Sequence, residues 1–358
     1  MKSTFWQLFY SRWKKTSQPA KPGFTVLLPV PADLPVFLRV ALDVCSRQIA
    51  PDLTEIIVIP DKFSRDFSNI FSKLKQQYSA TPITLTSFNS LEQAIANFQC
   101  NPHTYHWLQL IRGTEATKTE YALLHDSDLF ILEKNFMQSH YETAVKKELY
   151  CLGVSPVWDT WYEMQGISHI AATWEMILKP SWLRSFKPWR HRGHKDYLNG
   201  QLHAFDTTLW AQCQTPASKI SYHPDEQPFV HFNYVICTYR HFQKCTDSFV
   251  DDRFCLLLIR LLVDAFDDSD WAYDLPELEV LIAGLTDDSS PVVYKVKETR
   301  DKYYEFRGKF SKLLSSKVLR EEQKRILLNG LRPFDEAFIE SFDNTSTKKV
   351  AIMEDVFS

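Results

Sequence analysis

The sequence predicts an α/β fold in which a mostly parallel, Rossmann-like sheet is flanked by helices and followed by a helical C-terminal region. Short apolar runs typical of buried parallel strands occupy residues 24–30, 55–60 and 121–125. Segments with helical spacing separate these runs, which indicates βαβ units with right-handed crossovers. After residue 245 the apolar spacing is helical throughout, with alternating charges typical of solvated helix faces.

The first strand, residues 24–30, is nearly continuously apolar and ends at a proline-rich step. Residues 17–23 before it hold two prolines and a glycine, which favour a linker. The first helix is expected at residues 33–46, because five apolar side chains fall on one stripe: Leu34, Phe37, Leu38, Ala41 and Cys45.

The remaining elements follow from the same two periodicities. Further strands are expected at residues 55–60, 83–87, 121–125 and 148–154, and helices at 63–78, 90–98 and 105–118. Residues 155–222 are irregular and rich in Trp, His and Pro, and we expect substrate loops there with two helices near 170–178 and 207–213. The C-terminal helices are expected at 249–266, 275–285, 294–314, 320–331 and, more weakly, 336–342.

These elements divide the chain into an aromatic and basic N-terminal tail (residues 1–20), a catalytic α/β domain (21–245) and a C-terminal helical region (246–358). The sequence contains no apolar segment long enough to predict a signal peptide or a membrane-spanning helix. We therefore expect a cytoplasmic protein. The aromatic and basic tail leaves open a peripheral contact with the inner face of the membrane, and a disordered or core-docked tail is the alternative.

Composition excludes several classes of protein. The chain has 358 residues, 44% hydrophobic and 24% charged, which is ordinary for a globular protein. Its net charge of −3 argues against nucleic-acid binding. Seven scattered cysteines form no C-x-x-C pair, so neither a zinc ribbon nor a disulfide framework is indicated. The 14% aromatic content suits either stacking pockets for sugars or bases, or a Phe-rich core.

The strongest candidate for chemistry is the pair Asp126 and Asp128, directly after the strand 121–125 and before a second apolar run. Ligands of parallel sheets bind beyond the carboxyl ends of the strands. In an extended segment, residues i and i+2 point the same way. Two carboxylates about 5 Å apart repel by roughly 3 kcal/mol at an effective dielectric near 20. A divalent cation, Mn²⁺ or Mg²⁺, with substrate phosphates completing its shell, would offset this repulsion. A solvated acidic turn or helix cap is the alternative.

Other nucleotide and hydrolase motifs are absent. The sequence contains no G-x-x-x-x-G-K-[ST], no G-x-G-x-x-G after the first strand and no G-x-S-x-G. These absences argue against P-loop nucleoside triphosphatases, dinucleotide oxidoreductases and α/β-hydrolases.

Three segments of the chain, in their order, resemble the GT-A glycosyltransferases, in particular the family-2-like group. They are residues 25–30, residues 56–61 and the run Leu123-Leu124-His125-Asp126-Ser127-Asp128. The resemblance covers residues 21–245 and implies a GT-A-like fold. It also implies a glycosyltransferase of the hexosyltransferase type, which moves a sugar from a UDP- or GDP-linked donor to a saccharide or lipid-linked acceptor. Such an enzyme would be metal-dependent and inverting, with a role in polysaccharide biosynthesis.

The resemblance also implies roles for individual residues. Pro29 and Val30 would border the nucleotide pocket, and Asp61 would contact the base or ribose. Asp126 would contact the ribose or the metal, and Asp128 the metal. Family-2 members often have a richer acidic cluster after the second strand than the Asp61-Lys62 of this chain.

A histidine from later in the chain often completes the metal shell in GT-A enzymes, and His231 is the candidate, with His223 as runner-up. A satisfied core histidine is the alternative. Inverting transfer also needs a base for the acceptor hydroxyl. Asp206, at the start of an expected helix, matches the family's placement, although Asp is also a common helix N-cap. Glu175 and Asp196 are the other candidates for the base.

Residues 187–195 are dense in cations, and Arg190 and Arg192 are candidates to clamp the donor diphosphate from a mobile lid. A solvated basic loop is the alternative. Trp158, Trp161 and Tyr162 are candidates for an acceptor-sugar floor, or for core.

Two other functions compete with a transferase. A phosphohydrolase of the haloacid-dehalogenase type also places Asp-x-Asp after a strand, although three expected strands precede the motif here. A non-catalytic nucleotide-sugar or carbohydrate-binding protein with a degraded site is the third hypothesis.

Overall fold

The computed structural model describes residues 13, 19–62, 64–99, 102–244 and 253–343. The chain divides into two compact units, and the first ends at Phe229. The predicted boundary after residue 245 falls at a segment, 245–252, outside the described residues.

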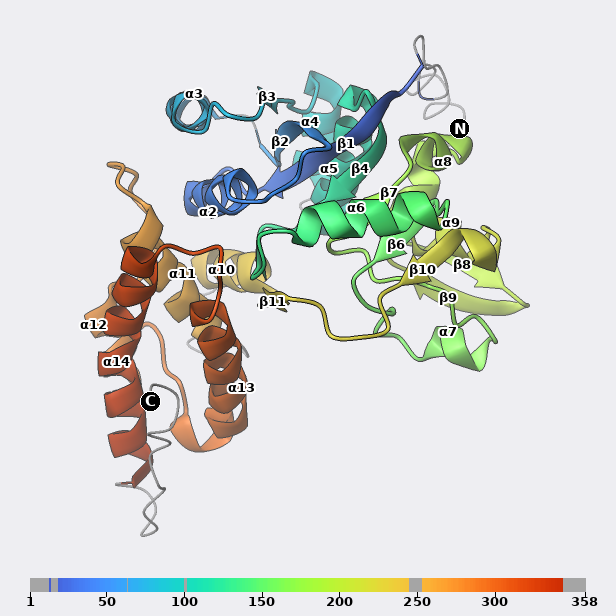
Figure 1. Cartoon of the computed structure of the whole chain (residues 1–358). Helices are drawn as coiled ribbons and strands as arrows, with labels where there is room; N and C mark the ends of the chain where they lie inside the picture. Colours follow the sequence, from blue (N-terminus) through green and yellow to red (C-terminus); the bar gives the residue numbers. More distant parts are fainter. Residues whose placement is uncertain (1–12, 14–18, 63, 100–101, 245–252, 344–358) are drawn as a thin grey trace. The chain divides into compact units, whose positions relative to one another are not determined.

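A seven-stranded sheet with the order β10-β6-β7-β4-β1-β2-β3 forms the centre of the first unit (Figure 1). Its strands are β1 (Lys21–Val30), β2 (Leu53–Pro60), β3 (Ile83–Leu85), β4 (Thr119–Leu124), β6 (Cys151–Gly153), β7 (Met176–Leu178) and β10 (Ile220–Tyr222). The pairs β1–β2, β1–β4, β2–β3 and β6–β10 are parallel, whereas β7 is antiparallel to β4 and β6. The predicted mostly parallel sheet is confirmed.

Helices cover both faces of this sheet, which explains why its central strands are apolar on both sides. The helices are α2 (Pro35–Ser46), α3 (Arg65–Gln77), α4 (Ser90–Gln99), α5 (Pro102–Ala116), α6 (Phe136–Lys146) and α8 (Pro180–Ser185). On one face, α5 packs against β1 and β2. On the other, Tyr141 of α6 contacts Phe24 and Tyr121, with ring centroids 5.1 and 5.7 Å apart.

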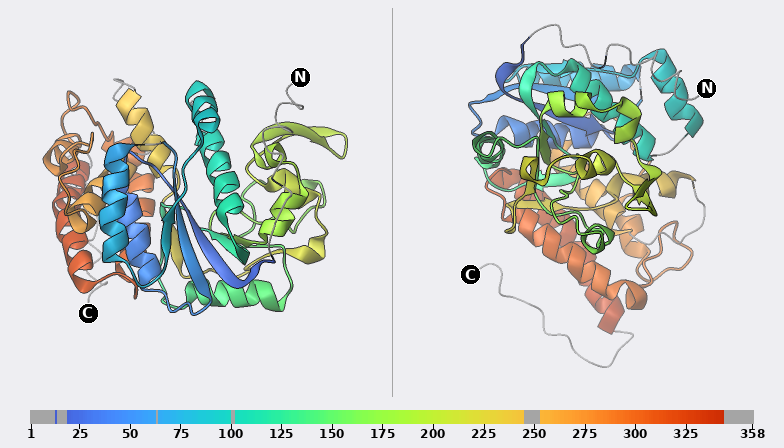
Figure 2. Two further views of the ribbon diagram at one scale, coloured as in Figure 1. Left: turned by 90° about the horizontal axis from the view of Figure 1, so that it is seen from above. Right: turned by 90° about the vertical axis from the view of Figure 1, so that its right-hand side faces the viewer.

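Helix α5 lies beside the central strands (Figure 2), and its close packing on them depends on Gly113. A Cβ at this position would lie 2.7 Å from Ile59 Cδ1 and 3.0 Å from Leu27 Cδ1. We therefore expect Gly113→Val to overpack this contact and to lower the free energy of unfolding by about 1–3 kcal/mol in urea titrations. The matched control is Gly308→Val in the second unit, where a Cβ meets nothing within 4 Å. Equal effects of the two variants would contradict this account of the contact.

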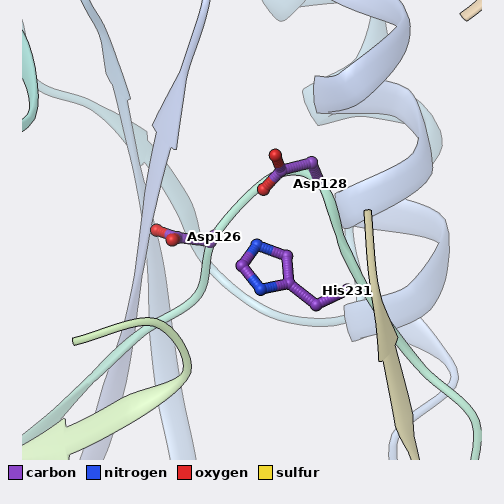
Figure 3. A group of neighbouring side chains, drawn as sticks. All are labelled: Asp126, Asp128 and His231. Atoms are coloured by element: carbon purple, nitrogen blue, oxygen red, sulfur yellow. The ribbon is translucent and has the colours of Figure 1, made fainter. Parts of the chain in front are cut away.

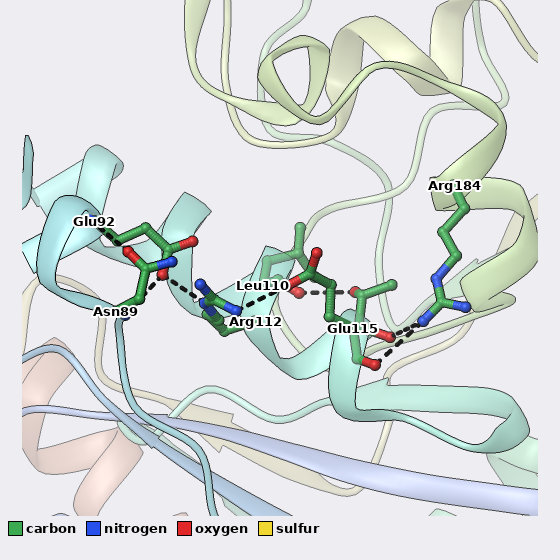
Figure 4. Close-up of polar contacts among 7 residues, drawn as sticks. Asn89, Glu92, Leu110, Arg112, Glu115 and Arg184 are labelled. Carbon is green, nitrogen blue, oxygen red and sulfur yellow. Dashed lines mark hydrogen bonds and ion pairs between the residues drawn. The ribbon is translucent and has the colours of Figure 1, made fainter. Parts of the chain in front are cut away.

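A polar chain on α5 ties it to its neighbouring helices (Figure 4). Asn89 caps α4 by accepting from the Glu92 amide at 2.9 Å, and Glu92 accepts from the Asn89 amide at 3.0 Å, as in a capping box. The fully buried Glu92 carboxylate also pairs with Arg112 of α5, which in turn contacts Glu115. Two residues after Arg112, the Thr114 carbonyl accepts from Arg184 of α8 at 2.7 Å. The C-terminal part of α5 is therefore held by both α4 and α8.

Shorter elements complete the first unit: β5 (Leu129–Ile131), α7 (Trp161–Met164), η1 (Pro188–His191), β8 (His194–Leu198), β9 (Gln201–Phe205), α9 (Leu209–Cys213) and η2 (Ala217–Lys219). Strand β11 (Phe229–His231) begins at the last residue of this unit. The expected helix near 170–178 is wrong, because Ile177 of β7 pairs with Leu123 and Leu152 in the sheet. Short apolar runs do not distinguish a strand from a helix by periodicity. The cation-rich segment is not a plain loop, because it forms η1 and then enters the β8–β9 hairpin.

After the end of β11, all regular elements of the second unit are helices in its described residues, as predicted for the C-terminal region. Its helices are α10 (Val235–Lys244), α11 (Phe254–Phe266), α12 (Leu278–Ala283), α13 (Val296–Leu314) and α14 (Glu321–Asp343). Helix α14 replaces two expected helices and contains Pro333. The helix continues past the proline because two side chains of the following turn are buried: Phe334 against Tyr294, and Phe338 against Tyr303.

No described helix combines the length and apolarity that crossing a bilayer requires. Of the N-terminal tail, Trp13 is described. Its side chain is buried in the core of the first unit, and its Nε1 donates to the Phe186 carbonyl at 2.8 Å. The other aromatic and basic residues of the tail lie outside the described residues.

Candidate metal and nucleotide site

One edge of the sheet collects most of the residues singled out in the sequence. Strands β1, β2, β4 and β6 are mutually parallel, so their carboxyl ends share this edge, and the antiparallel β7 begins there. Val30, Asp61 and Asp126 occupy or directly follow the ends of β1, β2 and β4, and Glu175 precedes β7. This edge is where parallel sheets bind their ligands.

Asp126, Asp128 and His231 each offer one ligand atom, and these atoms lie within 4.8 Å of one another (Figure 3). The two aspartates lie in the turn between β4 and β5. His231 ends β11, which pairs with β5, and the Leu132 amide donates to the Pro228 carbonyl at 2.8 Å beside that pairing. The strand pairing therefore brings His231 to the turn that carries the acids.

The chemistry of this group fits a divalent cation. Two carboxylates and an imidazole, all partly exposed, leave coordination positions for water or phosphate oxygens. Carboxylate oxygens suit Mg²⁺ and Mn²⁺, whereas imidazole is a ligand typical of transition metals. The described residues therefore provide a candidate metal site of the composition expected from the sequence.

A buried ion pair lies next to the acids. His125 Nδ1 is 2.5 Å from Glu175 Oε2, and both side chains are almost wholly shielded from solvent. Burial lowers the pKa of His125, but the charge and hydrogen bond of Glu175, with the charges of Asp126 and Asp128, outweigh it and leave this pKa raised. Glu175 has a positive φ of 46°. The Glu175 carboxylate is therefore fully buried against His125, the residue before Asp126, whereas an acceptor hydroxyl would need access to its base.

Two histidines of α5, His103 and His106, reach the same site and were not identified from the sequence. His106 Nε2 lies 3.6 Å from Asp126 Oδ1, and His103 Nδ1 lies 3.3 Å from Asp206 Oδ1. Burial lowers the pKa of His106, but its hydrogen bond with Asp126 and the charges of the neighbouring aspartates leave it raised. The signal available in the sequence was the i, i+3 spacing, which places both imidazoles on one face of a helix.

Asp206 follows β9 and precedes α9, at a strained turn. Thr208 has a φ of 65°, which is rare for a β-branched residue and is typical of functional sites. Burial raises the pKa of Asp206, but the hydrogen bonds from His103 and the Thr207 amide, with the charges of His103 and His106, leave it below its ordinary value. Asp206 is therefore an ionised, partly exposed carboxylate. It interacts electrostatically with His106, and His106 in turn contacts Asp126.

The two candidate arginines differ in their surroundings. Arg190 pairs with Asp196 and stacks over Trp210 at 4.2 Å, so both Arg190 and Asp196, the alternative base, are engaged locally. Arg192 is half-buried and has no side-chain partner among the described residues, and burial lowers its pKa. Its neighbour Gly193 runs close to Asp206, since a Cβ there would lie 3.8 Å from Asp206 Oδ1. Of the two candidate arginines, Arg192 is therefore the one without a side-chain partner among the described residues.

Pro29 and Val30 lie at the end of β1, and Asp61 directly follows β2. Asp61 is buried, and its Oδ1 accepts from the Ala32 amide at 3.0 Å. Gln109 of α5 donates to the carbonyls of Ile59 and Val30 at 2.6 and 3.3 Å. His223, by contrast, lies apart from the acids and contacts His140, with Nε2 2.9 Å from Nδ1. His223 is therefore not part of the candidate metal group.

No family model and no curated protein matches the sequence. Among solved structures, the chain resembles the mannosyltransferase PcManGT from Pyrobaculum calidifontis in complex with GDP-Man and Mn²⁺, at 13% identity over 97% of this chain and 96% of that one, with a TM-score of 0.43. It also resembles S. aureus TarS 1–349 in complex with UDP-GlcNAc, at 12% identity over 92% and 93%, with a TM-score of 0.39. A third is glucosyl-3-phosphoglycerate synthase from Mycobacterium tuberculosis, at 14% identity over 45% and 58%, with a TM-score of 0.31. Likenesses this weak carry no argument about function, which rests on the side chains of the site.

Proposed function

We propose that this chain is a GT-A-type glycosyltransferase that moves a sugar from a UDP- or GDP-linked donor to a hydroxyl of a saccharide or lipid-linked acceptor. The observation that carries the proposal is the group Asp126, Asp128 and His231 at the ligand-binding edge of the sheet. A separate ionised carboxylate, Asp206, is connected to it through the histidines of α5. Such a pairing of a metal group and a second acid is what transfer from a nucleotide diphosphate requires.

A divalent ion bound by Asp126, Asp128 and His231 would neutralise negative charge on the departing diphosphate. The presence of an imidazole favours Mn²⁺ over Mg²⁺ in this role. Arg192 would donate hydrogen bonds to the phosphates as a second cation. Pro29, Val30 and Asp61 would border the nucleoside, with Asp61 held in place by the Ala32 amide.

Asp206 would accept the proton of the acceptor hydroxyl as that oxygen attacks the anomeric carbon. A single displacement of this kind inverts the configuration at that carbon. His103 would hold Asp206 in position through their 3.3 Å contact. Because His103 and His106 keep the pKa of Asp206 low, the carboxylate remains ionised and ready to accept a proton at neutral pH.

Donor hydrolysis tests the proposal without knowledge of the acceptor. We expect the purified chain to release UDP or GDP from at least one sugar in a panel of UDP- and GDP-sugars with Mn²⁺, and EDTA to abolish the release. Release of phosphate from p-nitrophenyl phosphate, with no nucleotide-sugar cleavage, would instead indicate the phosphohydrolase. Binding of nucleotide without any hydrolysis or transfer would indicate the non-catalytic protein.

His103→Gln should shift the pH dependence of this reaction in a defined direction. Removing the imidazole removes a hydrogen bond and a charge that lower the pKa of Asp206. As the base must be ionised, activity falls as the pH drops through its pKa, so the acidic limb of kcat/KM should move to higher pH in this variant. An acidic limb that stays in place or moves to lower pH would contradict the pairing of His103 with the base.

A further inference from the structure

The exposed Trp158 and the partly exposed Trp174 stack on each other. The rings of Trp158 and Trp174 have centroids 5.1 Å apart and an interplanar angle of 23°. Trp158 is 53% exposed, whereas Tyr162, which the sequence grouped with it, is fully buried in a small apolar cluster. Large apolar side chains that remain exposed as a packed group are typical of ligand-binding surfaces.

The topology places this pair at the same sheet edge as the acids. Trp158 follows β6, which is parallel to β4, and Trp174 precedes β7, which begins at that edge. The two segments are joined, because the Val157 amide donates to the Ile170 carbonyl at 3.0 Å and Ala172 donates to Ser155 at 3.0 Å. Strand β6 is two strands from β4, or about 10 Å across the sheet. Trp174 also directly precedes Glu175, the partner of His125.

Polar groups flank the tryptophans. Asp159, next in the chain to Trp158, is partly exposed, and its Oδ2 lies 3.2 Å from His203 Nε2. His203 in turn stacks on Trp161, with centroids 3.7 Å apart and planes within 4°. An aromatic face beside a carboxylate and an imidazole complements a sugar ring, whose C–H face is apolar and whose edge carries hydroxyls.

We propose that the stacked pair Trp158–Trp174, with Asp159 beside it, is a carbohydrate-binding platform that takes a pyranose ring of the acceptor. The binding of a sugar is inferred from the aromatic geometry alone. That this sugar belongs to the acceptor rests on the proposed function. It selects a saccharide as the acceptor, since a flat aromatic face flanked by polar side chains matches a pyranose ring rather than a bare lipid chain.

Binding of disaccharides to Trp158 variants tests the platform. The probes are maltose, cellobiose, chitobiose, lactose and mannobiose, measured by ligand-observed NMR on the full chain. We expect at least one to bind, Trp158→Ala to weaken that binding about tenfold, and Trp158→Phe to restore most of it, because an aromatic face is what the ring contacts. Trp271→Ala is the matched control, since this partly exposed tryptophan belongs to the second unit, and it should leave binding unchanged.

Failure of all five probes to bind, or equal binding by Trp158→Ala and the unaltered chain, would overturn the platform. The melting-temperature shift with Mn²⁺ and UDP or GDP, measured on the same variants, separates this inference from the proposed function. A retained shift in Trp158→Ala with weakened sugar binding supports the platform. Sugar binding through Trp158 in a chain that shows no nucleotide shift would keep the platform and refute the transferase.

Discussion

Asp206→Asn is expected to lower the rate of sugar transfer by about 10²- to 10⁴-fold, the usual contribution of a positioned general base. The amide keeps the shape of the side chain and its contact with the Thr207 amide, which lies 2.7 Å from Asp206 Oδ1. It cannot accept the acceptor proton. Transfer to a saccharide acceptor is the measurement, with the most active donor from the hydrolysis panel.

The same variant should bind nucleotide and Mn²⁺ as the unaltered chain does, because Asp206 is not among the three residues of the metal group. Asp196→Asn is the matched control. Asp196 lies on the β8–β9 hairpin, which directly precedes Asp206, and it is engaged with Arg190, so its loss should change transfer much less. Transfer by Asp206→Asn within a fewfold of the unaltered rate would remove Asp206 from the role of base.

Glu175→Ala is expected to lower the free energy of unfolding of the chain by about 3–5 kcal/mol, because it leaves the buried His125 without its partner. Chemical denaturation monitored by fluorescence measures the change. Glu305→Ala removes one partner of the exposed pair with Lys309, and it should cost less than about 1 kcal/mol.

A double variant, His125→Ala with Glu175→Ala, gives the coupling between the two side chains. We expect the double variant to be less destabilised than the sum of the single changes. Additive effects would show that the 2.5 Å contact does not stabilise the fold, and that the turn carrying Asp126 is held by other means.

The parallel core of the fold was predictable because its strands are buried on both faces. Residues 24–30 and 55–60 are almost continuously apolar, and they form most of the interior strands β1 and β2. Strand β7 was mistaken for a helix because it has three residues, Met176–Leu178, and so carries no periodicity. Its antiparallel direction depends on a tertiary pairing that no local pattern contains.

The three residues of the metal group were predictable from the sequence for different reasons. Asp126 and Asp128 stand out because carboxylates between two apolar runs are unusual. His231 was chosen among several histidines through a family resemblance, and the pairing of β11 with β5 brings it to the acids. His103 and His106 were missed because their spacing on α5 is common on solvated helices, and their partners Asp206 and Asp126 are distant in sequence. The exposure that separates Trp158 from the buried Tyr162 is likewise a property of the folded chain.

Metal-dependent binding of nucleotide tests the central claim most directly. The melting temperature is measured with UDP and with GDP, each with and without Mn²⁺, for the unaltered chain, Asp128→Asn and the exposed control Asp225→Asn. Ligands that bind the native state raise the melting temperature by mass action. We predict a rise that needs both a nucleotide and Mn²⁺, is lost in Asp128→Asn and is kept in Asp225→Asn. A rise that is the same with and without Mn²⁺, or that survives in Asp128→Asn, would contradict the assignment of these acids to a metal–diphosphate site.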